Sequence, residues 1–303
     1  MPETILLAGA TGRLGRRIAA HLTQRRAEVR AIVRPATVPA KVDELRATGA
    51  TIIESDFSDA KRLADACRGA SCVVSAVAGL RDVIVDAQSQ LLEAAVVAGV
   101  PRFIPSDYCI DYTKLAPGNN RNLDVRREFK ERLDNAPIAA TSILNGMFTG
   151  LLTGQAPVIL FDRKRVLHWG NADQLMDFTT LEDTAAYTAA AALDPVTPRF
   201  LRVAGDEISA RGLSIVASEL TGQKFKLIRP GGLGAFNVII GIMRTLMPAH
   251  DNLYPPWQGM QYLRDMLSGE AKLEPLDNRR YSDISFATVR DVLSNYLAQT
   301  NLR

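Results

Sequence analysis

Three glycines at a spacing of three residues follow a short apolar run and give one segment the composition of an anion-binding turn. The segment consists of Gly9, Ala10, Thr11, Gly12, Arg13, Leu14 and Gly15. Apolar residues 5–8 predict a strand before it, and the amphipathic pattern of residues 14–24 predicts a helix after it. Glycine permits a sharp turn and a close approach, while the helix offers free N–H groups and the positive end of its dipole. We therefore expect a pyrophosphate to bind here, the alternative being a glycine-rich turn without a ligand.

The cation after the next predicted strand bears on the choice of nucleotide. The glycine spacing is a variant of the dinucleotide-binding fingerprint, and NAD-binding folds place an acid near the end of the second strand for the ribose hydroxyls. Here residues 28–33 are followed by Arg34 and Pro35. Arg34 can pair with a 2′-phosphate, helped by Arg13 or Lys41, so NADP(H) is favoured over NAD(H). The alternative is that Arg34 is an ordinary exposed arginine.

Residues at the ends of the third and fourth predicted strands complete the expected cofactor site. Asp56 and Phe57 close the third strand, where an acid and an aromatic ring can meet an adenine. Asp56 is alternatively the cap of the helix that follows. Ala76, Val77 and Ala78 end the fourth strand, where small side chains leave room for a cofactor to cross the sheet edge.

The spacing of the tyrosines does not identify a proton donor. Short-chain dehydrogenases use a tyrosine and a lysine one helical turn apart, but Tyr112 stands four residues after Tyr108, and Ala116 four residues after Tyr112. Tyr108 or Tyr112 could still donate a proton from the loop. The alternative is a buried tyrosine whose hydroxyl group is already satisfied.

Residue type and spacing exclude two other classes of chemistry. His21, His168 and His250 are isolated from one another and from clusters of Cys or carboxylates, so no metal site is expected. Ser106 has neither a G-x-S-x-G elbow nor a plausible histidine partner, which excludes a serine hydrolase.

Composition predicts a folded protein of the cytoplasm. The 303 residues are 47% hydrophobic and 23% charged, which excludes a disordered tail or a short disulfide scaffold. A net charge of +3 is too small to predict a nucleic-acid or membrane surface. Cys67, Cys72 and Cys109 form no paired framework, so reduced thiols are expected. The apolar stretch 233–247 is interrupted by a glycine and an arginine and is too short to span a membrane.

The elements that must position these residues alternate between strands and helices in the first half of the chain. Short apolar runs predict strands at residues 5–8, 28–33, 51–54, 72–76, 103–105 and 141–144. Apolar residues at three- and four-residue spacing predict helices at residues 14–24, 39–48, 60–67, 83–98 and 124–134. The pattern predicts an α/β fold with a doubly wound parallel sheet of the Rossmann type over residues 1–150.

A smaller C-terminal α/β lobe for the substrate is expected over residues 151–303, with re-entry of the chain into the first domain left open. A hairpin with a charged tip is predicted at residues 158–169. Helices are predicted at residues 182–193, 209–220, 259–267 and 288–298. The proline-rich residues 247–256 predict a loop that could cover a site.

Four motifs together resemble the NmrA-like and isoflavone reductase-like group of atypical short-chain dehydrogenases/reductases. They are the glycine turn at residues 9–15, Val33-Arg34-Pro35, Ser55-Asp56-Phe57 and Arg102-Phe103-Ile104-Pro105-Ser106-Asp107-Tyr108. The resemblance, strongest over residues 4–150, implies a Rossmann domain with a smaller substrate lobe, NADP(H) binding, and often the reduction of phenylpropanoid-like or other aromatic substrates. Some members of the group are regulators that bind the dinucleotide without turning it over.

The resemblance also implies site residues beyond the fourth strand. Residues 105–108 resemble the family's Pro-Ser-Glu-Phe stretch, which leaves the fifth strand beside the nicotinamide and so places Ser106 at the cofactor. The family's catalytic lysine in the following helix corresponds to Lys130, with Arg126 or Arg127 as alternatives. The other interpretation of Lys130 is a solvated side chain paired with a carboxylate of its own helix.

A turn after the sixth predicted strand resembles the family's Asn-containing turn. It brings Asn145 to the cofactor and puts Met147 and Phe148 at the junction of the two domains. There, the two apolar side chains either cover an aromatic substrate or form interdomain core.

The leading hypothesis is an NADP(H)-dependent reductase that transfers a hydride to a small, aromatic or carbonyl-bearing substrate. The rivals are a non-catalytic dinucleotide-binding redox sensor, favoured by the absent tyrosine-lysine pair, and an epimerase or isomerase that retains NADP. The expected partner is a small molecule rather than nucleic acid or membrane. A homodimer, or a protein partner in the case of a regulator, is left open.

Overall fold

A six-stranded parallel sheet forms the centre of the computed structural model, which describes residues 2–248 and 251–300. Its strands are β1 (Thr4–Ala8), β2 (Glu28–Val33), β3 (Thr51–Glu54), β4 (Cys72–Ser75), β5 (Arg102–Ile104) and β6 (Ala139–Ala140). They lie in the order β3-β2-β1-β4-β5-β6, so the direction of winding reverses between β1 and β4. The predicted Rossmann class is confirmed, and ligands of such sheets bind at this point of reversal.

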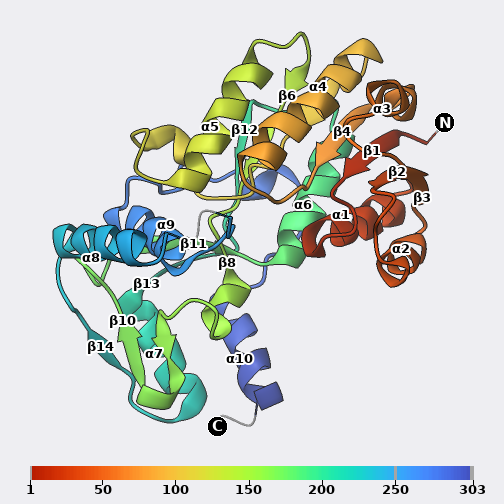
Figure 1. The fold of residues 1–303 in the computed structure, drawn as a ribbon. Coiled ribbons are helices and arrows are strands. Elements are labelled where there is room, and N and C mark those ends of the chain that lie inside the picture. Colours follow the sequence, from red (N-terminus) through yellow and green to blue (C-terminus); the bar gives the residue numbers. More distant parts are fainter. Residues whose placement is uncertain (1, 249–250, 301–303) are drawn as a thin grey trace.

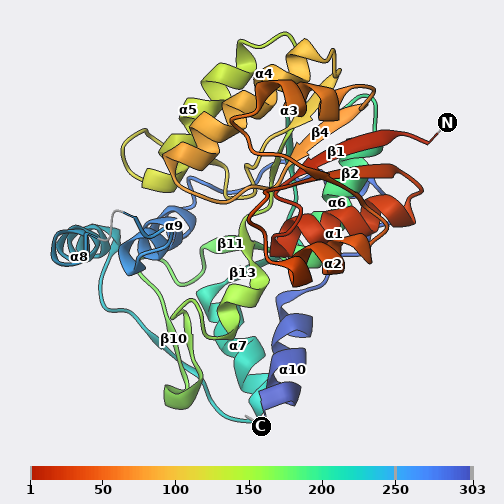
Figure 2. The ribbon, with the colours of Figure 1, turned by 45° about the vertical axis from the view of Figure 1, so that its right-hand side comes forward.

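Helices cover both faces of the sheet (Figures 1 and 2). One face carries α1 (Arg13–Gln24), α2 (Pro39–Arg46) and α6 (Leu181–Leu193), and the other carries α3 (Ala60–Cys67), α4 (Gln88–Val97) and α5 (Arg121–Asp134). A π-helical turn, η1 (Asp82–Ala87), leads into α4. Ile5 and Leu7 of β1 pack on the first face, and Leu6 and Ala8 on the second. Burial on both faces explains the continuous apolar run of β1.

The strand predicted at residues 141–144 is divided between two sheets. The backbone N–H of Thr141 donates to the carbonyl of Phe103 in β5 at 3.0 Å, whereas that of Ser142 donates to the carbonyl of Arg199 at 2.8 Å. Residues from Ser142 onward form β7 (Ser142–Leu144), which pairs in parallel with β12 (Phe200–Arg202). Together with α6, β12 brings the chain back to the first domain after residue 150.

The rest of the chain forms a lobe with two small sheets and four helices (Figure 1). One sheet contains β8 (Met147–Phe148), β11 (Leu175–Thr179) and β13 (Asp206–Ser209); the other contains β9 (Ile159–Leu160), β10 (Arg165–Leu167) and β14 (Lys226–Ile228). The helices are α7 (Ala210–Thr221), α8 (Leu233–Leu246), α9 (Pro256–Ser268) and α10 (Val289–Thr300). Short 3-10 turns are η2 (Tyr112–Lys114), η3 (Thr149–Thr153), η4 (Phe161–Arg163) and η5 (Asn278–Arg280).

Most predictions for this lobe are confirmed. The antiparallel pair β9 and β10 is the predicted hairpin, and α6, α7, α9 and α10 occupy the four predicted helical ranges. The apolar stretch 233–247 folds as α8, which the sequence did not identify as a helix. None of the helices in residues 2–248 and 251–300 combines the length and apolar composition needed to cross a membrane.

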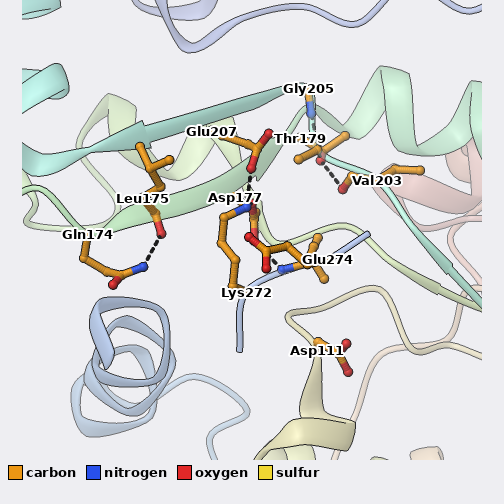
Figure 3. A network of polar contacts seen from close by, with 12 residues as sticks. Asp111, Gln174, Leu175, Asp177, Thr179, Val203, Gly205, Glu207, Lys272 and Glu274 are labelled. Atoms are coloured by element: carbon orange, nitrogen blue, oxygen red, sulfur yellow. Dashed lines mark hydrogen bonds and ion pairs between the residues drawn. The ribbon is translucent and has the colours of Figure 1, made fainter. Parts of the chain in front are cut away.

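A buried lysine, Lys272, fastens the segment after α9 to the lobe, as Figure 3 shows, and its carbonyl links this segment to η2. Lys272 forms ion pairs with Asp177 of β11 and Glu207 of β13, and the Leu273 N–H donates to Asp177 Oδ2 at 2.8 Å. The carbonyl of Lys272 accepts a hydrogen bond of 2.6 Å from Lys114 in η2. This connection fixes the lobe against the loop that follows β5.

Candidate functional site

The glycine turn packs tightly against the end of β4. Gly9 has φ +74°, and a Cβ there would lie 2.4 Å from the carbonyl oxygen of Ala76. A Cβ at Gly15 would lie 2.3 Å from the carbonyl oxygen of Gly9, which itself accepts a 3.0 Å hydrogen bond from the Gly12 N–H. The first and third glycines are therefore required by packing, and the turn holds the start of α1 close to the sheet edge.

The N-terminus of α1 is electrostatically incomplete. Gly12 is its N-cap and has no side chain to accept the first amides, and the first turn contains no acid. Arg13 stands at the first helical position, exposed and with no ion pair in the described part of the chain. A cation at the positive end of a helix dipole costs about 0.3–1 kcal/mol, whereas an anion there is stabilised. The free amides and Arg13 together favour a bound anion.

A cavity of about 550 Å³ extends from this turn over the ends of β4 and β5 into the C-terminal lobe. Its lining residues come from the turn and α1, the two strand ends, α5, β8 and η3, the start of α6, the segment after α8, and α10. They are Gly12, Arg13, Leu14, Arg17, Ala76, Val77, Ala78, Ser106, Tyr108, Arg126, Phe148, Gly150, Leu151, Gln155, Thr180, Leu181, Glu182, Tyr254 and Val292.

Eight residues predicted from the sequence line this cavity: Gly12, Arg13, Leu14, Ala76, Val77, Ala78, Ser106 and Tyr108. Gly9, Thr11 and Gly15 shape the turn without lining the cavity. Ser106 joins the two strand ends, because its Oγ donates to the carbonyl of Val77 at 2.6 Å and its N–H donates to Gln88 Oε1 at 2.9 Å. This bracing fixes the position of Ser106 in the cavity wall.

The residues expected at the adenosine end lie on the surface beyond β2 and β3. Arg34, Lys41 and Asp56 are exposed. Hydrogen bonds from the Ser58 N–H and Oγ lower the pKa of the Asp56 carboxyl, with a smaller contribution from the charge of Arg34. The helix α3 is capped by Asp59 instead, which accepts from the Arg62 N–H.

Phe57 and Asn145 lie away from the cavity that contains the turn. Phe57 lines a separate groove of about 540 Å³ between α3 and α4, because its ring packs with the core on that face of the sheet. Asn145 is fully buried behind the cavity wall, where its Nδ2 donates to Thr184 Oγ1 at 3.4 Å. Neither side chain lines the cavity, and the roles predicted for them at the cofactor stay predictions.

The tyrosines after β5 are both buried, with different surroundings. Tyr108 lines the cavity and packs into the core beside α6. Burial raises the pKa of its phenol, while Thr188 opposes the shift. Tyr112 donates from its hydroxyl to Asp107 Oδ2 at 2.9 Å, outside the cavity. Asp107 also accepts from Ser142 at 2.7 Å, and burial raises the pKa of its carboxyl.

The three basic residues considered on α5 point to three different places. Lys130 forms an ion pair with Asp134 and lies 5.9 Å from the ring centre of Phe200, one turn beyond the cavity. Arg127 donates to the carbonyls of Tyr112 and Leu115, at 3.0 and 2.9 Å. Arg126 alone of the three lines the cavity. Lys130 does not line the cavity, and its role at the nicotinamide stays a prediction.

Arg126 is a buried cation without a counter-ion. The residue is 8% exposed, and its side chain forms no ion pair within residues 2–248 and 251–300. Nη1 donates to the carbonyl of Asn122 at 2.7 Å, and Nε has no hydrogen-bond partner. Burial acts to lower the pKa of Arg126, yet its pKa stays above the ordinary value, and an arginine is not deprotonated in a protein, so the guanidinium remains charged.

Several lining residues were not assigned to a ligand from the sequence. Phe148 was considered either a substrate cover or interdomain core, and it lines the cavity, whereas Met147 packs into the core of the lobe. Tyr254 comes from the predicted loop, and Val292 from α10. Since Tyr254 and Val292 follow the glycine turn by more than two hundred residues, no local spacing could connect these two residues with the turn.

Comparisons with known proteins agree with this architecture. Residues 1–229 match the NmrA-like family. Pinoresinol reductase 1 of Arabidopsis thaliana is 28% identical over 208 residues, which cover 64% of this chain and 65% of that protein. A bifunctional pinoresinol-lariciresinol reductase of Thuja plicata is 32% identical over 208 residues, covering 64% and 66% of the two chains. The match thus spans a little less than two thirds of these relatives.

Solved structures extend the likeness of fold to nearly the whole chain. An isoflavone reductase structure has a TM-score of 0.80 and 19% identity, covering 98% of this chain and 100% of that one. The structure described as AtPrR2 with NADP+ and (+)pinoresinol has a TM-score of 0.79 and 21% identity, covering 98% and 99%. The NADPH-dependent quinone oxidoreductase QOR2 of Escherichia coli, complexed with NADPH, has a TM-score of 0.74 and 18% identity, covering 96% and 99%.

Proposed function

The chain belongs to the NmrA-like family, and from this premise we propose that it is an NADP(H)-dependent reductase acting on a small aromatic or carbonyl-bearing molecule. The resemblance noted in the sequence is confirmed by the match over residues 1–229. The named relatives reduce pinoresinol, lariciresinol or isoflavones, or carry NADP(H) in their structures. The observation that carries the proposal is the single cavity joining the uncapped start of α1 to a buried cation, Arg126.

The residues present fit a dinucleotide phosphate. The amides after Gly12 lack a side-chain cap, and Arg13 beside them has no ion pair among the described residues. These groups would hold the pyrophosphate. Arg34 is exposed at the end of β2, the position where NAD-binding folds have an acid, and it would pair with the 2′-phosphate of NADP(H). Small side chains at Ala76 and Ala78, which line the cavity, would leave room for the cofactor at the end of β4.

When bound, the cofactor supplies the hydride, and the protein orients the reactants and stabilises charge on the substrate. Ser106 is fixed in the cavity wall by Val77 and Gln88, and Phe148 and Tyr254 provide aromatic surface for a ring. Arg126 would hold a substrate oxygen. Because an arginine cannot be deprotonated in a protein, Arg126 orients and stabilises but transfers no proton.

Calorimetry with NADPH and NADH tests the cofactor assignment. We expect tighter binding of NADPH, and in Arg34→Ala a loss of NADPH affinity of about tenfold to a hundredfold, since a charge-assisted hydrogen bond contributes roughly 1.5–3 kcal/mol. Arg62→Ala, an exposed arginine on α3, is the matched control and should leave both affinities unchanged. Tighter binding of NADH by the unaltered protein would contradict the assignment.

Turnover is tested by following NADPH absorbance with a furofuran lignan, an isoflavone and a quinone. Consumption of NADPH with any of them supports the reductase. Binding of NADPH without consumption across a wider panel of aromatic carbonyl compounds would favour the redox sensor. Conversion of a substrate with no net consumption would favour an epimerase or isomerase.

A further inference from the structure

We propose that Arg126 binds a carboxylate on the substrate, so that the preferred substrates are aromatic acids. This inference rests on the proposed function, which it makes more specific. It is carried by a buried guanidinium that lines the cavity and has no carboxylate within 4.0 Å in the described chain.

The hydrogen-bonding capacity of Arg126 is mostly unused. A guanidinium carries five N–H donors. Here, Nη1 donates to the Asn122 carbonyl at 2.7 Å, Nε is buried without a partner, and Nη2 donates to no residue that the structure describes. A buried charge is expensive unless it is paired and hydrogen-bonded. The planar fork of an arginine matches the two oxygens of a carboxylate.

Asp107 is the carboxyl group whose charge acts on Arg126, but it does not neutralise the guanidinium. Its interaction with Arg126 is a long-range one, since no ion pair joins them within 4.0 Å. Its Oδ2 already accepts hydrogen bonds from Tyr112 and Ser142. Burial raises the pKa of Asp107, and the charge of Arg126 is one of the effects that oppose this shift. The other groups that face Arg126 are phenols and a thiol, which are neutral at ordinary pH.

The surroundings of Arg126 suit an aromatic ring attached to the carboxylate. Phe148, Leu151 and Tyr254 line the same cavity. The free amides at the start of α1 already provide for the cofactor's pyrophosphate. Arg126, contributed by α5 from the opposite face of the sheet, is thus left for a second anion.

Calorimetric titration of cinnamate and cinnamamide into the protein saturated with NADP+ tests the inference. The two probes share their shape and differ in the charged group. We expect cinnamate to bind at least about tenfold more tightly, and Arg126→Gln to weaken cinnamate binding by about tenfold to a hundredfold while leaving cinnamamide unchanged. Arg126→Lys should keep part of the preference, because it keeps the charge and loses the fork.

Arg127→Gln is the matched control, because Arg127 neighbours Arg126 and donates only to carbonyls outside the cavity. It should preserve the preference for cinnamate. Equal affinities for the two probes in the unaltered protein would overturn the inference, as would an equal loss of both in Arg126→Gln. Binding of cinnamate to the cofactor-free protein but not to the protein saturated with NADP+ would also overturn it and assign Arg126 to a cofactor phosphate.

The unaltered protein and Arg126→Lys decide the matter if Arg126→Gln does not fold. None of these titrations requires turnover. A protein that binds NADPH inertly would contradict the reductase and still show the carboxylate preference, so the two proposals fail separately.

Discussion

Arg126 donates from Nη1 to the backbone carbonyl of Asn122, one helical turn earlier in α5, at 2.7 Å. The side chain of Asn122 donates in turn from Nδ2 to the carbonyl of Leu253 at 3.0 Å. Leu253 directly precedes Tyr254, which lines the cavity. One asparagine therefore connects the buried cation with the segment that carries an aromatic wall of the same cavity.

Replacing Asn122 with alanine should raise the KM for substrate while leaving the affinity for NADPH unchanged. The variant loses the hydrogen bond to Leu253 and the one that Asn122 Oδ1 accepts from Arg121 Nε. A net contribution of about 1 kcal/mol corresponds to roughly a fivefold change. Steady-state kinetics with calorimetry on NADPH would measure the two effects. Asn119→Ala, an exposed neighbour, is the control. An equal change of both constants would show that Asn122 supports the whole domain rather than the substrate end.

Replacing Gly9 with alanine should destabilise the protein more than the same change at Gly118. Both glycines have positive φ, +74° and +84°, so both substitutions impose a left-handed conformation that costs about 1–2 kcal/mol. At Gly118 a Cβ meets open space, whereas at Gly9 it would lie 2.4 Å from the carbonyl oxygen of Ala76. Urea denaturation isolates the clash as the difference between the variants. Equal losses would mean that the strand end yields without cost.

The first half of the fold could be predicted because its strands are buried on both faces. β1 is apolar throughout, and helices such as α1 show three- and four-residue spacing. After residue 150, the β9–β10 hairpin was predicted from its charged turn, whereas β11 to β14 have no such turn signal and were not predicted. The change of sheet after Thr141 depends on which carbonyl each backbone amide donates to, and no local sequence pattern predicts that.

The candidate site was predictable where it depends on local backbone and not where it depends on tertiary placement. The glycine turn and the ends of β4 and β5 follow from the order of strands. The choice between Arg126 and Lys130 requires knowing which turn of α5 meets the cavity. Phe57 was expected at an adenine; its ring lines the groove between α3 and α4, and the expected contact stays a prediction. The sequence alone does not show which of two nearby side chains on a helix or loop faces the cavity, because that depends on how the element packs.

Replacing Lys272 with methionine should cost about 3–5 kcal/mol of stability, because it leaves Asp177 buried without its cation. Lys272 and Asp177 are 10% and 5% exposed at their side chains, and Figure 3 shows them meeting between β11 and the segment after α9. Lys61→Met removes an ion pair whose lysine is 86% exposed and should cost less than about 1 kcal/mol. Chemical denaturation of both variants gives the comparison.

The double variant Lys272→Met/Asp177→Asn should recover part of that loss, because no buried charge remains unpaired. Burial already raises the pKa of Asp177, with Lys272 opposing the shift. If the double variant loses as much stability as the two single variants together, Lys272 acts through its contacts with Glu207 and with the backbone instead.

Replacing His168 with glutamine should remove a pH-dependent part of the stability. Burial, together with the positive charges of Arg229 and Arg211, lowers the pKa of His168 below its ordinary value of 6.5. The residue is 5% exposed, and its Nδ1 atom has no hydrogen-bond partner within the described ranges. The folded protein thus binds a proton less readily than the unfolded chain, so stability is full above about pH 6.5 and falls as pH decreases through that value toward the folded pKa.

Unfolding free energies of the unaltered protein and His168→Gln, measured between about pH 7.5 and pH 5, test this sign. The unaltered protein should lose more stability on acidification, by about 1.4 kcal/mol for each unit by which the pKa is lowered. Parallel curves would contradict the prediction. A steeper fall in the variant would reverse it, because it would mean that the folded state stabilises the imidazolium, which the neighbouring Arg229 and Arg211 oppose.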